Sequence, residues 1–213
     1  SVEPFAEATD KLSGFYFKIK SYGVNIEHFD VGGGIGVSYD GEKSFTVYEY
    51  AKSLLPKLKK LDCEIFFEPG RYLTANGGIL VTKVLFSKKN NLKNFIIVDT
   101  AMNDLLRPGL YSAYHHIQPV EISKADKDIT ADIVGPVCES GDFFAKDRKI
   151  TEVNSGENLA IMSAGAYGMV MSSNYNARRR PAEVLVDGNN FKIIRSRETF
   201  DHLLYDEERL MER

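Results

Sequence analysis

Two glycine-rich segments near the start of this 213-residue chain carry groups that can bind an anion. The first is Gly32-Gly33-Gly34-Ile35-Gly36 and the second is Glu68-Pro69-Gly70-Arg71. Glycines at the end of a strand let a phosphate approach backbone N–H groups, and the Arg71 guanidinium can pair with the same anion. Taken alone, the first segment is equally consistent with a tight turn, and the second with a Glu–Arg surface pair. Together they favour a phosphate site.

Three segments in the second half of the chain hold side chains that bind carboxylates or move protons. Arg107 and Tyr111 lie in a turn-rich segment that, by itself, predicts a structured loop. Cys138 stands beside Glu139 between glycines, which fits either a β-turn with a buried cysteine or a proton donor at an accessible turn. Tyr167 lies in Ala-Gly-Ala-Tyr-Gly, which is otherwise a plain strand end.

The sequence matches neither a dinucleotide motif nor a metal motif. The G-x-G-x-x-G pattern fails because Val37 stands where its third glycine is required. His28, His115, His116 and His202 show no metal-ligand spacing with acidic residues. We therefore predict no Rossmann-type site and no metal.

The elements that must position these residues change in character near residue 75. The first part alternates between helix and strand, with a helix predicted over residues 4–22, a strand over 26–31, a helix over 46–61 and a strand over 64–67. Thr46 and Glu49 have capping-box spacing at the start of the second helix. A helix between two strands predicts a parallel pair, whose C-terminal ends would carry the two glycine-rich segments.

The second part predicts a β domain of mainly antiparallel strands. Candidate strands follow one another with turn-rich connections, at residues 78–86, 95–99, 117–122, 129–134, 158–163, 182–186 and 191–195. A charged segment with interspersed leucines predicts a surface helix over residues 198–213. We therefore divide the chain into residues 1–75 and 76–213.

Composition narrows the class of protein. Lys and Arg total 27 and Asp and Glu total 30, so the net charge of −3 argues against binding nucleic acid. The apolar runs are far shorter than the ~18 residues of a membrane span, and the start shows no secretory leader. Cys63 and Cys138 are too few for a disulfide scaffold, so a cytoplasmic location is expected.

The motifs in their order resemble one enzyme family over nearly the whole chain. Six segments are similar to segments of the diaminopimelate decarboxylases, namely HFDVGGGIG, EPGR, MNDLLRPGLYSAYH, GPVCESGD, AGAYGMVMSSNYN and RPAEVLV. These form a branch of the barrel-type (fold III) pyridoxal-phosphate decarboxylases. The resemblance implies that residues 1–75 are the last two strands of a cofactor-binding (β/α)₈ TIM barrel, and that a C-terminal β domain follows.

The resemblance also implies roles for individual residues. The cofactor pyridoxal 5'-phosphate would be bound by Gly33, Gly34, Glu68, Gly70, Arg71 and Tyr167, with Glu68 at the pyridine nitrogen. The amino-acid substrate would be bound by Arg71, Arg107, Tyr111, Glu139 and Tyr167. Cys138 would return a proton to the substrate carbon after CO₂ leaves. In this family the Cys–Glu loop enters the neighbouring subunit's site, so a homodimer with shared active sites is expected.

The chain also departs from the family. The lysine that holds the cofactor covalently lies in a motif like Leu-Lys-Ala-Asn, and this motif does not occur here. The expected activity, conversion of meso-2,6-diaminopimelate to L-lysine and CO₂, would therefore belong to a complete enzyme of which this chain is the C-terminal part. Two alternatives stay open, namely a related decarboxylase of a basic amino acid or polyamine precursor and a non-catalytic dimerising fragment.

Overall fold

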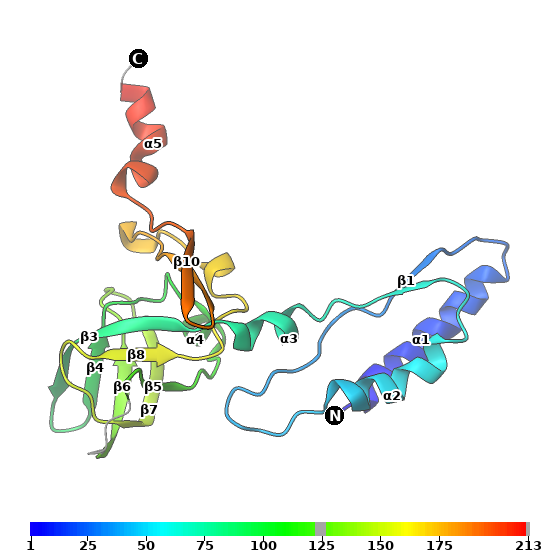
Figure 1. Ribbon diagram of the computed structural model, residues 1–213, viewed down its shortest axis with the longest axis horizontal. Helices are drawn as coiled ribbons and strands as arrows, with labels where there is room; N and C mark the ends of the chain where they lie inside the picture. Colours follow the sequence, from blue (N-terminus) through cyan, green and yellow to red (C-terminus); the bar gives the residue numbers. More distant parts are fainter. Residues whose placement is uncertain (122–126, 212–213) are drawn as a thin grey trace. The chain divides into compact units, whose positions relative to one another are not determined.

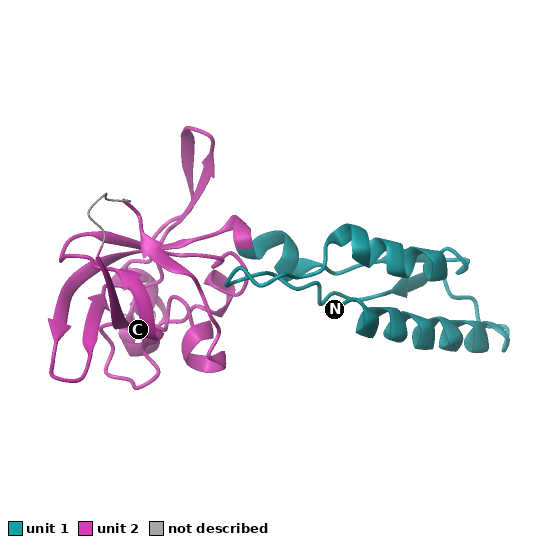
Figure 2. Cartoon of the chain, turned by 90° about the horizontal axis from the view of Figure 1, so that it is seen from below, with its two compact units in different colours: residues 1–75 teal, residues 76–213 magenta. Residues whose placement is uncertain are grey.

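The computed structural model describes residues 1–121 and 127–211 (Figure 1). The chain divides into two compact units, Ser1–Ala75 and Asn76–Arg213, which Figure 2 shows in different colours. Within the described ranges, no helix combines the length and the apolar character needed to cross a bilayer.

The first unit contains the predicted alternation of helices and strands. Its elements are α1 (Glu3–Lys20), β1 (His28–Asp30), α2 (Val47–Leu58), β2 (Glu64–Phe66) and the short α3 (Gly70–Thr74). Strands β1 and β2 are parallel, as predicted, with Phe29 opposite Ile65. The capping box is confirmed, because the Thr46 hydroxyl accepts a hydrogen bond from the Glu49 N–H and the Glu49 carboxylate accepts one from the Thr46 N–H.

One apolar cluster holds this unit together. Helices α1 and α2 pack against each other and against β1, and the buried side chains are Tyr16, Phe29, Ile35, Tyr50, Leu54, Leu58 and Leu61. Helix α2 ends earlier than predicted, two residues after Pro56, which cannot donate a backbone hydrogen bond. This cluster fixes the strand ends from which the glycine-rich segments leave.

The second unit is built on a mixed six-stranded sheet. Its strand order is β5-β8-β3-β4-β6-β7, with bounds β3 (Leu80–Lys89), β4 (Asn94–Val98), β5 (Ile117–Pro119), β6 (Asp128–Val134), β7 (Phe143–Thr151) and β8 (Asn158–Ile161). Every neighbouring pair is antiparallel except β4 and β6, which are parallel. A parallel pair needs a long crossover connection, and the chain between β4 and β6 supplies one.

A hairpin and a helix complete the second unit. Strands β9 (Glu183–Asp187) and β10 (Asn190–Arg195) pair with each other as a separate two-stranded sheet, and helix α5 (Phe200–Met211) follows them in the chain (Figure 1). Of the predicted strand over residues 117–122, Ile122 lies outside the described residues, as do the last two residues of the predicted terminal helix.

Strand β7 and helix α4 of the second unit were not predicted. Strand β7 has the charged residues Lys146, Asp147 and Arg148 at its centre, so its sequence lacks the apolar–polar alternation of a regular strand. In addition, Asp147 adopts a φ of 47°, which is not an extended conformation. Helix α4 (Arg107–Tyr111) stands where we expected a loop. Pro108 favours the first turn of a helix, and only five residues are helical, too few to produce a periodic pattern.

Candidate functional site

The two glycine-rich segments of the first unit lie side by side. The Val31 N–H donates to the Phe66 carbonyl at 3.0 Å, and the Glu68 N–H donates to the Gly32 carbonyl at 2.9 Å. A Cβ atom on Gly33 would stand 2.2 Å from the Glu68 carbonyl oxygen, closer than real Cβ contacts occur. Glycine is therefore required at position 33 for the two segments to pair this closely.

The same segments offer the hydrogen-bond donors for a phosphate and the acceptor for a protonated ring nitrogen. Glu68 and Arg71 are exposed at the surface of this unit, and a Cβ atom on Gly70 would meet no heavy atom within 4 Å. Gly34 adopts a φ of 91°, which side-chain-bearing residues rarely adopt. An arginine with glycine backbone suits a phosphate, and a carboxylate suits a ring N–H, so these residues fit pyridoxal phosphate.

Arg107 is fixed in the second unit by a buried histidine. Only 7% of Arg107 is exposed, and its Nη1 atom lies 3.0 Å from Nε2 of His115, which is fully buried. The other ring nitrogen of His115, Nδ1, lies 2.8 Å from the Met162 carbonyl oxygen. The Arg148 guanidinium donates to the His115 carbonyl at 2.8 Å, so three segments converge on this histidine.

Burial is the largest influence on the charge of His115. It lowers the pKa of the imidazole below the ordinary value of 6.5, and the charges of Arg107 and Arg148 act in the same direction. The hydrogen bond to Met162 opposes this shift. The folded protein therefore keeps His115 neutral at a pH at which the unfolded chain would begin to protonate it.

We expect this difference to make folding acid-sensitive. Because the folded pKa is lowered, the stability that His115 contributes is present above 6.5 and is lost as the pH falls toward the folded pKa. Between about pH 7.5 and about pH 5.5, the thermal midpoint of the wild type should fall as the pH is lowered, and that of His115→Gln should fall less. His116→Gln, at the exposed neighbouring position, should keep the wild-type decline, and equal slopes for wild type and His115→Gln would contradict the expectation.

The segment that carries Cys138 and Glu139 is anchored by Asp142. One oxygen of this buried carboxylate accepts from the Met102 N–H and the other from the Val137 N–H, both at 2.7 Å. Burial raises the pKa of the Asp142 carboxyl, while the two N–H groups act in the opposite direction. Cys138 itself is exposed, so the interpretation of a buried cysteine is wrong, and the thiol is accessible.

Among the carboxylates of this segment, Asp142 should contribute the most to the free energy of unfolding. Asp142→Asn replaces one acceptor oxygen by an NH₂ group and should lower the free energy of unfolding by about 1.5–3 kcal/mol, the range for a hydrogen bond to a charged group. Urea unfolding at neutral pH measures this change. Asp128→Asn removes an exposed ion pair with Lys149 and should cost at most about 1 kcal/mol. Equal losses in the two variants would contradict the anchoring role.

Close backbone approaches join the Arg107 segment to the Cys138 segment. A Cβ atom on Gly109 would lie 2.5 Å from the Gly141 carbonyl oxygen. Tyr111, at the end of α4, is 63% exposed. The second unit therefore brings Arg107, Tyr111, Cys138 and Glu139 into adjoining segments.

Tyr167 adopts an unusual backbone conformation. Its φ is 61°, in the left-handed region that a bulky residue rarely occupies, and the residue is 42% exposed. The following residue, Gly168, approaches the Ala164 carbonyl so closely that a Cβ atom would stand 2.4 Å from it. Such strain persists only where the surroundings impose it, and it is enriched at functional sites.

Our sequence analysis assigned no role to three residues of this site. Besides His115 and Asp142, Tyr175 was missed; its hydroxyl donates to the Glu139 carboxylate at 3.3 Å, and the negative charge of Glu139 raises the pKa of Tyr175. His115 and Asp142 end two of the motifs that we quoted, which was the available signal. Tyr175 lies in AGAYGMVMSSNYN, which was also a signal, but its contact with Glu139 could not be predicted because the two residues are distant in the sequence.

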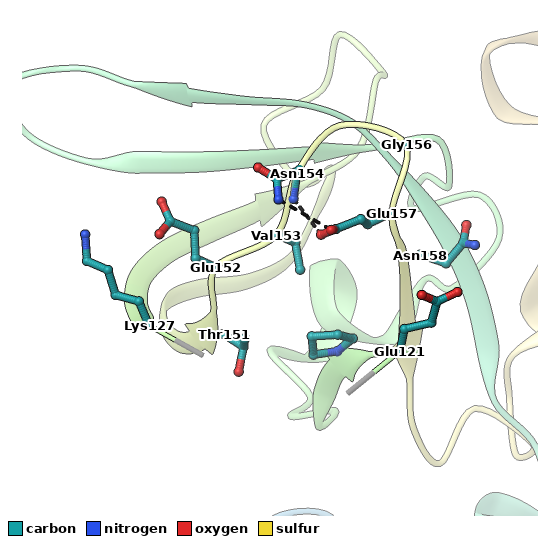
Figure 3. Close-up of a pocket in the computed structure, with 10 residues that line it drawn as sticks. Glu121, Lys127, Thr151, Glu152, Val153, Asn154, Gly156, Glu157 and Asn158 are labelled. Atoms are coloured by element: carbon teal, nitrogen blue, oxygen red, sulfur yellow. Dashed lines mark hydrogen bonds between the residues drawn. The ribbon is translucent and has the colours of Figure 1, made fainter. Parts of the chain in front are cut away.

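A separate pocket in the second unit holds none of the predicted site residues (Figure 3). Its lining includes the acidic residues Glu121, Glu152 and Glu157 and one lysine, Lys127. The Glu157 carboxylate accepts a hydrogen bond from the Asn154 N–H at 2.7 Å. This acidic lining is unsuited to a phosphate. Among the described residues, no group of three or more His, Cys, Asp or Glu side chains gathers as metal ligands.

Comparisons with known proteins agree on one family. The family model described as "Pyridoxal-dependent decarboxylase, C-terminal sheet domain" matches residues 29–165. Over 204 residues, 95% of this chain, it is 48% identical to diaminopimelate decarboxylase of Aquifex aeolicus and 49% identical to that of Vibrio cholerae. It covers 48% of each of these proteins, so the chain spans about half the length of the curated relatives that it matches.

Solved structures agree with this result. The crystal structure of diaminopimelate decarboxylase from Helicobacter pylori, in complex with L-lysine, superposes with a TM-score of 0.91 at 42% identity. The match covers 98% of this chain and 52% of that one. A lysine/ornithine decarboxylase from Vibrio vulnificus shares the fold, with a TM-score of 0.75 at 18% identity.

Proposed function

Because the chain belongs to the pyridoxal-dependent decarboxylase family and matches its C-terminal sheet domain, we propose that it is the C-terminal part of a diaminopimelate decarboxylase. The complete enzyme would convert meso-2,6-diaminopimelate to L-lysine and CO₂. The observation that carries this proposal is the identity of 48% to such an enzyme over 95% of the chain. The proposed location is the cytoplasm, because two cysteines are too few for the disulfide scaffold typical of small secreted proteins.

The first unit would contribute to cofactor binding. Backbone N–H groups of Gly33, Gly34 and Gly70, with the Arg71 guanidinium, would hold the phosphate. The Glu68 carboxylate would accept a hydrogen bond from the ring nitrogen and keep it protonated. When bound, pyridoxal phosphate supplies an electron sink for the pair left on the substrate carbon as CO₂ departs.

The second unit would recognise the far end of the substrate. Diaminopimelate carries a second carboxylate there, and the Arg107 guanidinium, with the Tyr111 hydroxyl and Arg71, would bind it by charge-assisted hydrogen bonds. Glu139 would accept from the ammonium group at the same end. The exposed Tyr167, held in its strained conformation, would flank cofactor and substrate.

Cys138 would complete the reaction by moving a proton. As the bond to the departing carboxylate breaks, the substrate carbon must gain a proton, and the accessible Cys138 thiol can donate one from Sγ. We propose that it does so across a homodimer interface. Exposed apolar side chains on the β9–β10 hairpin, among them Val186, Phe191 and Ile193, support association with further polypeptide.

Two measurements on the complete enzyme, which must contain the cofactor-binding lysine that this chain lacks, test the proposal. With added pyridoxal phosphate, meso-diaminopimelate should release equal amounts of CO₂ and L-lysine. After borohydride reduction, the intact mass of a chain in the preparation should include one pyridoxyl adduct. A preparation that gives neither CO₂ nor an adduct would support the non-catalytic dimerising alternative.

A further inference from the structure

The hydrogen-bond partners of His115 show which of its two ring nitrogens carries a proton. Its Nδ1 atom faces the Met162 carbonyl at 2.8 Å, and a carbonyl can only accept, so Nδ1 carries a proton. Its Nε2 atom faces the Arg107 guanidinium at 3.0 Å, and a guanidinium can only donate, so Nε2 carries none. The ring is therefore the neutral Nδ1–H tautomer.

From this arrangement we infer that His115 is the positioning residue of Arg107, and so sets the preference for substrates that carry a second carboxylate. The acceptor is neutral, so the bond orients the guanidinium without cancelling its charge. A carboxylate in the same place would orient Arg107 equally well but would neutralise it and weaken its attraction for an anionic group. This inference rests on the proposed role of Arg107.

The surroundings of His115 keep it in this state. It is fully buried, with the guanidinium of Arg107 from α4 at its Nε2 atom and that of Arg148 from β7 at its backbone carbonyl. Arg148 also stacks over the Tyr114 ring, 4.0 Å from its centroid, which holds it at the backbone of the histidine. Both arginines oppose a positive charge on the ring.

Two substitutions of His115 test its two hydrogen bonds separately, because one can keep the bond to Arg107 and the other cannot. In His115→Gln the amide reaches the position of Nε2 and its oxygen can accept from Arg107. In His115→Asn the amide reaches only the position of Nδ1, so it can donate to Met162 but cannot reach Arg107. Both variants are polar amides at a buried site, so they form a matched pair for stability.

Inhibition of the holoenzyme by L-lysine and by cadaverine measures the effect. L-Lysine carries a carboxylate for Arg107 and cadaverine lacks one. His115→Asn should raise the inhibition constant of L-lysine about 10- to 100-fold, as expected for a lost bond to a charged group, and leave that of cadaverine within about threefold. His115→Gln should recover most of the loss. Equal weakening of both inhibitors, or equal behaviour of the two variants, would overturn the inference.

The tautomer can be measured independently of the function. In ¹⁵N-histidine-labelled protein at neutral pH, the His115 signals should show a protonated Nδ1 and an unprotonated Nε2, and His115→Gln assigns them. A doubly protonated ring or the Nε2–H tautomer would overturn the inference even in an active enzyme. A correct tautomer in a protein that releases no CO₂ from diaminopimelate would instead refute the proposed function and, with it, the role in substrate preference.

Discussion

Arg107→Ala should raise the KM for meso-diaminopimelate about 30- to several-thousand-fold, with a smaller change in kcat. Removing one partner of a hydrogen-bonded charge pair costs about 2–5 kcal/mol, and this cost falls on substrate binding if Arg107 holds the distal carboxylate. Steady-state kinetics of the complete enzyme measure it. A decarboxylase of a basic amino acid, which forms a simple diamine, would be almost indifferent to the change, because its substrate has no carboxylate at the distal end.

Lys149→Ala is the matched control for this variant. Lys149 lies on β7, where it is exposed and pairs with Asp128 at 2.9 Å, so its loss should leave the KM within about twofold. The thermal midpoint of Arg107→Ala should be measured as well, because the side chain is buried. A folded Arg107→Ala enzyme with an unchanged KM would contradict the diaminopimelate proposal.

Gly33→Ala should reduce the affinity for pyridoxal phosphate about 10- to 100-fold. Its Cβ atom would stand 2.2 Å from the Glu68 carbonyl oxygen, and a backbone atom cannot swing aside as a flexible side chain can. The two segments must separate, which costs about 1–3 kcal/mol and moves the groups proposed to hold the phosphate. Titration of the apoenzyme with the cofactor, followed by absorbance, gives the dissociation constant.

Gly14→Ala provides the comparison for this second variant. Gly14 lies inside α1, and a Cβ atom there meets nothing within 4 Å, so alanine should stabilise the helix by about 0.5–1 kcal/mol. Cofactor affinity should not change. If Gly33→Ala bound the cofactor as tightly as Gly14→Ala, the paired glycine-rich segments could not be the phosphate site.

Features that depend on neighbouring residues were predictable from the sequence. The Thr46–Glu49 capping box and the parallel pairing of β1 with β2 follow from short-range spacing and from one intervening helix. The family followed from several motifs in a fixed order, each weak by itself. Strand β7 was missed because Lys146, Asp147 and Arg148 interrupt its apolar alternation.

Features that depend on distant contacts were not predictable. The parallel pairing of β4 with β6 requires knowledge of the path taken by the long connection between them. The neutral state of His115 depends on the Met162 carbonyl, which only the folded sheet brings to the ring. The exposure of Cys138 depends on how Asp142 anchors its segment, since the amino-acid type alone favours burial.

The position of β8 in the sheet has a consequence for biosynthesis. β8 lies between β5 and β3, and it pairs Leu80 with Ile161, residues that a ribosome adds many seconds apart. Until Ile161 has left the exit tunnel, the edges of β3 and β5 lack their partner and can pair with another nascent chain. Contacts this distant in sequence also slow refolding, so we expect the second unit to depend on chaperones more than its size alone would suggest.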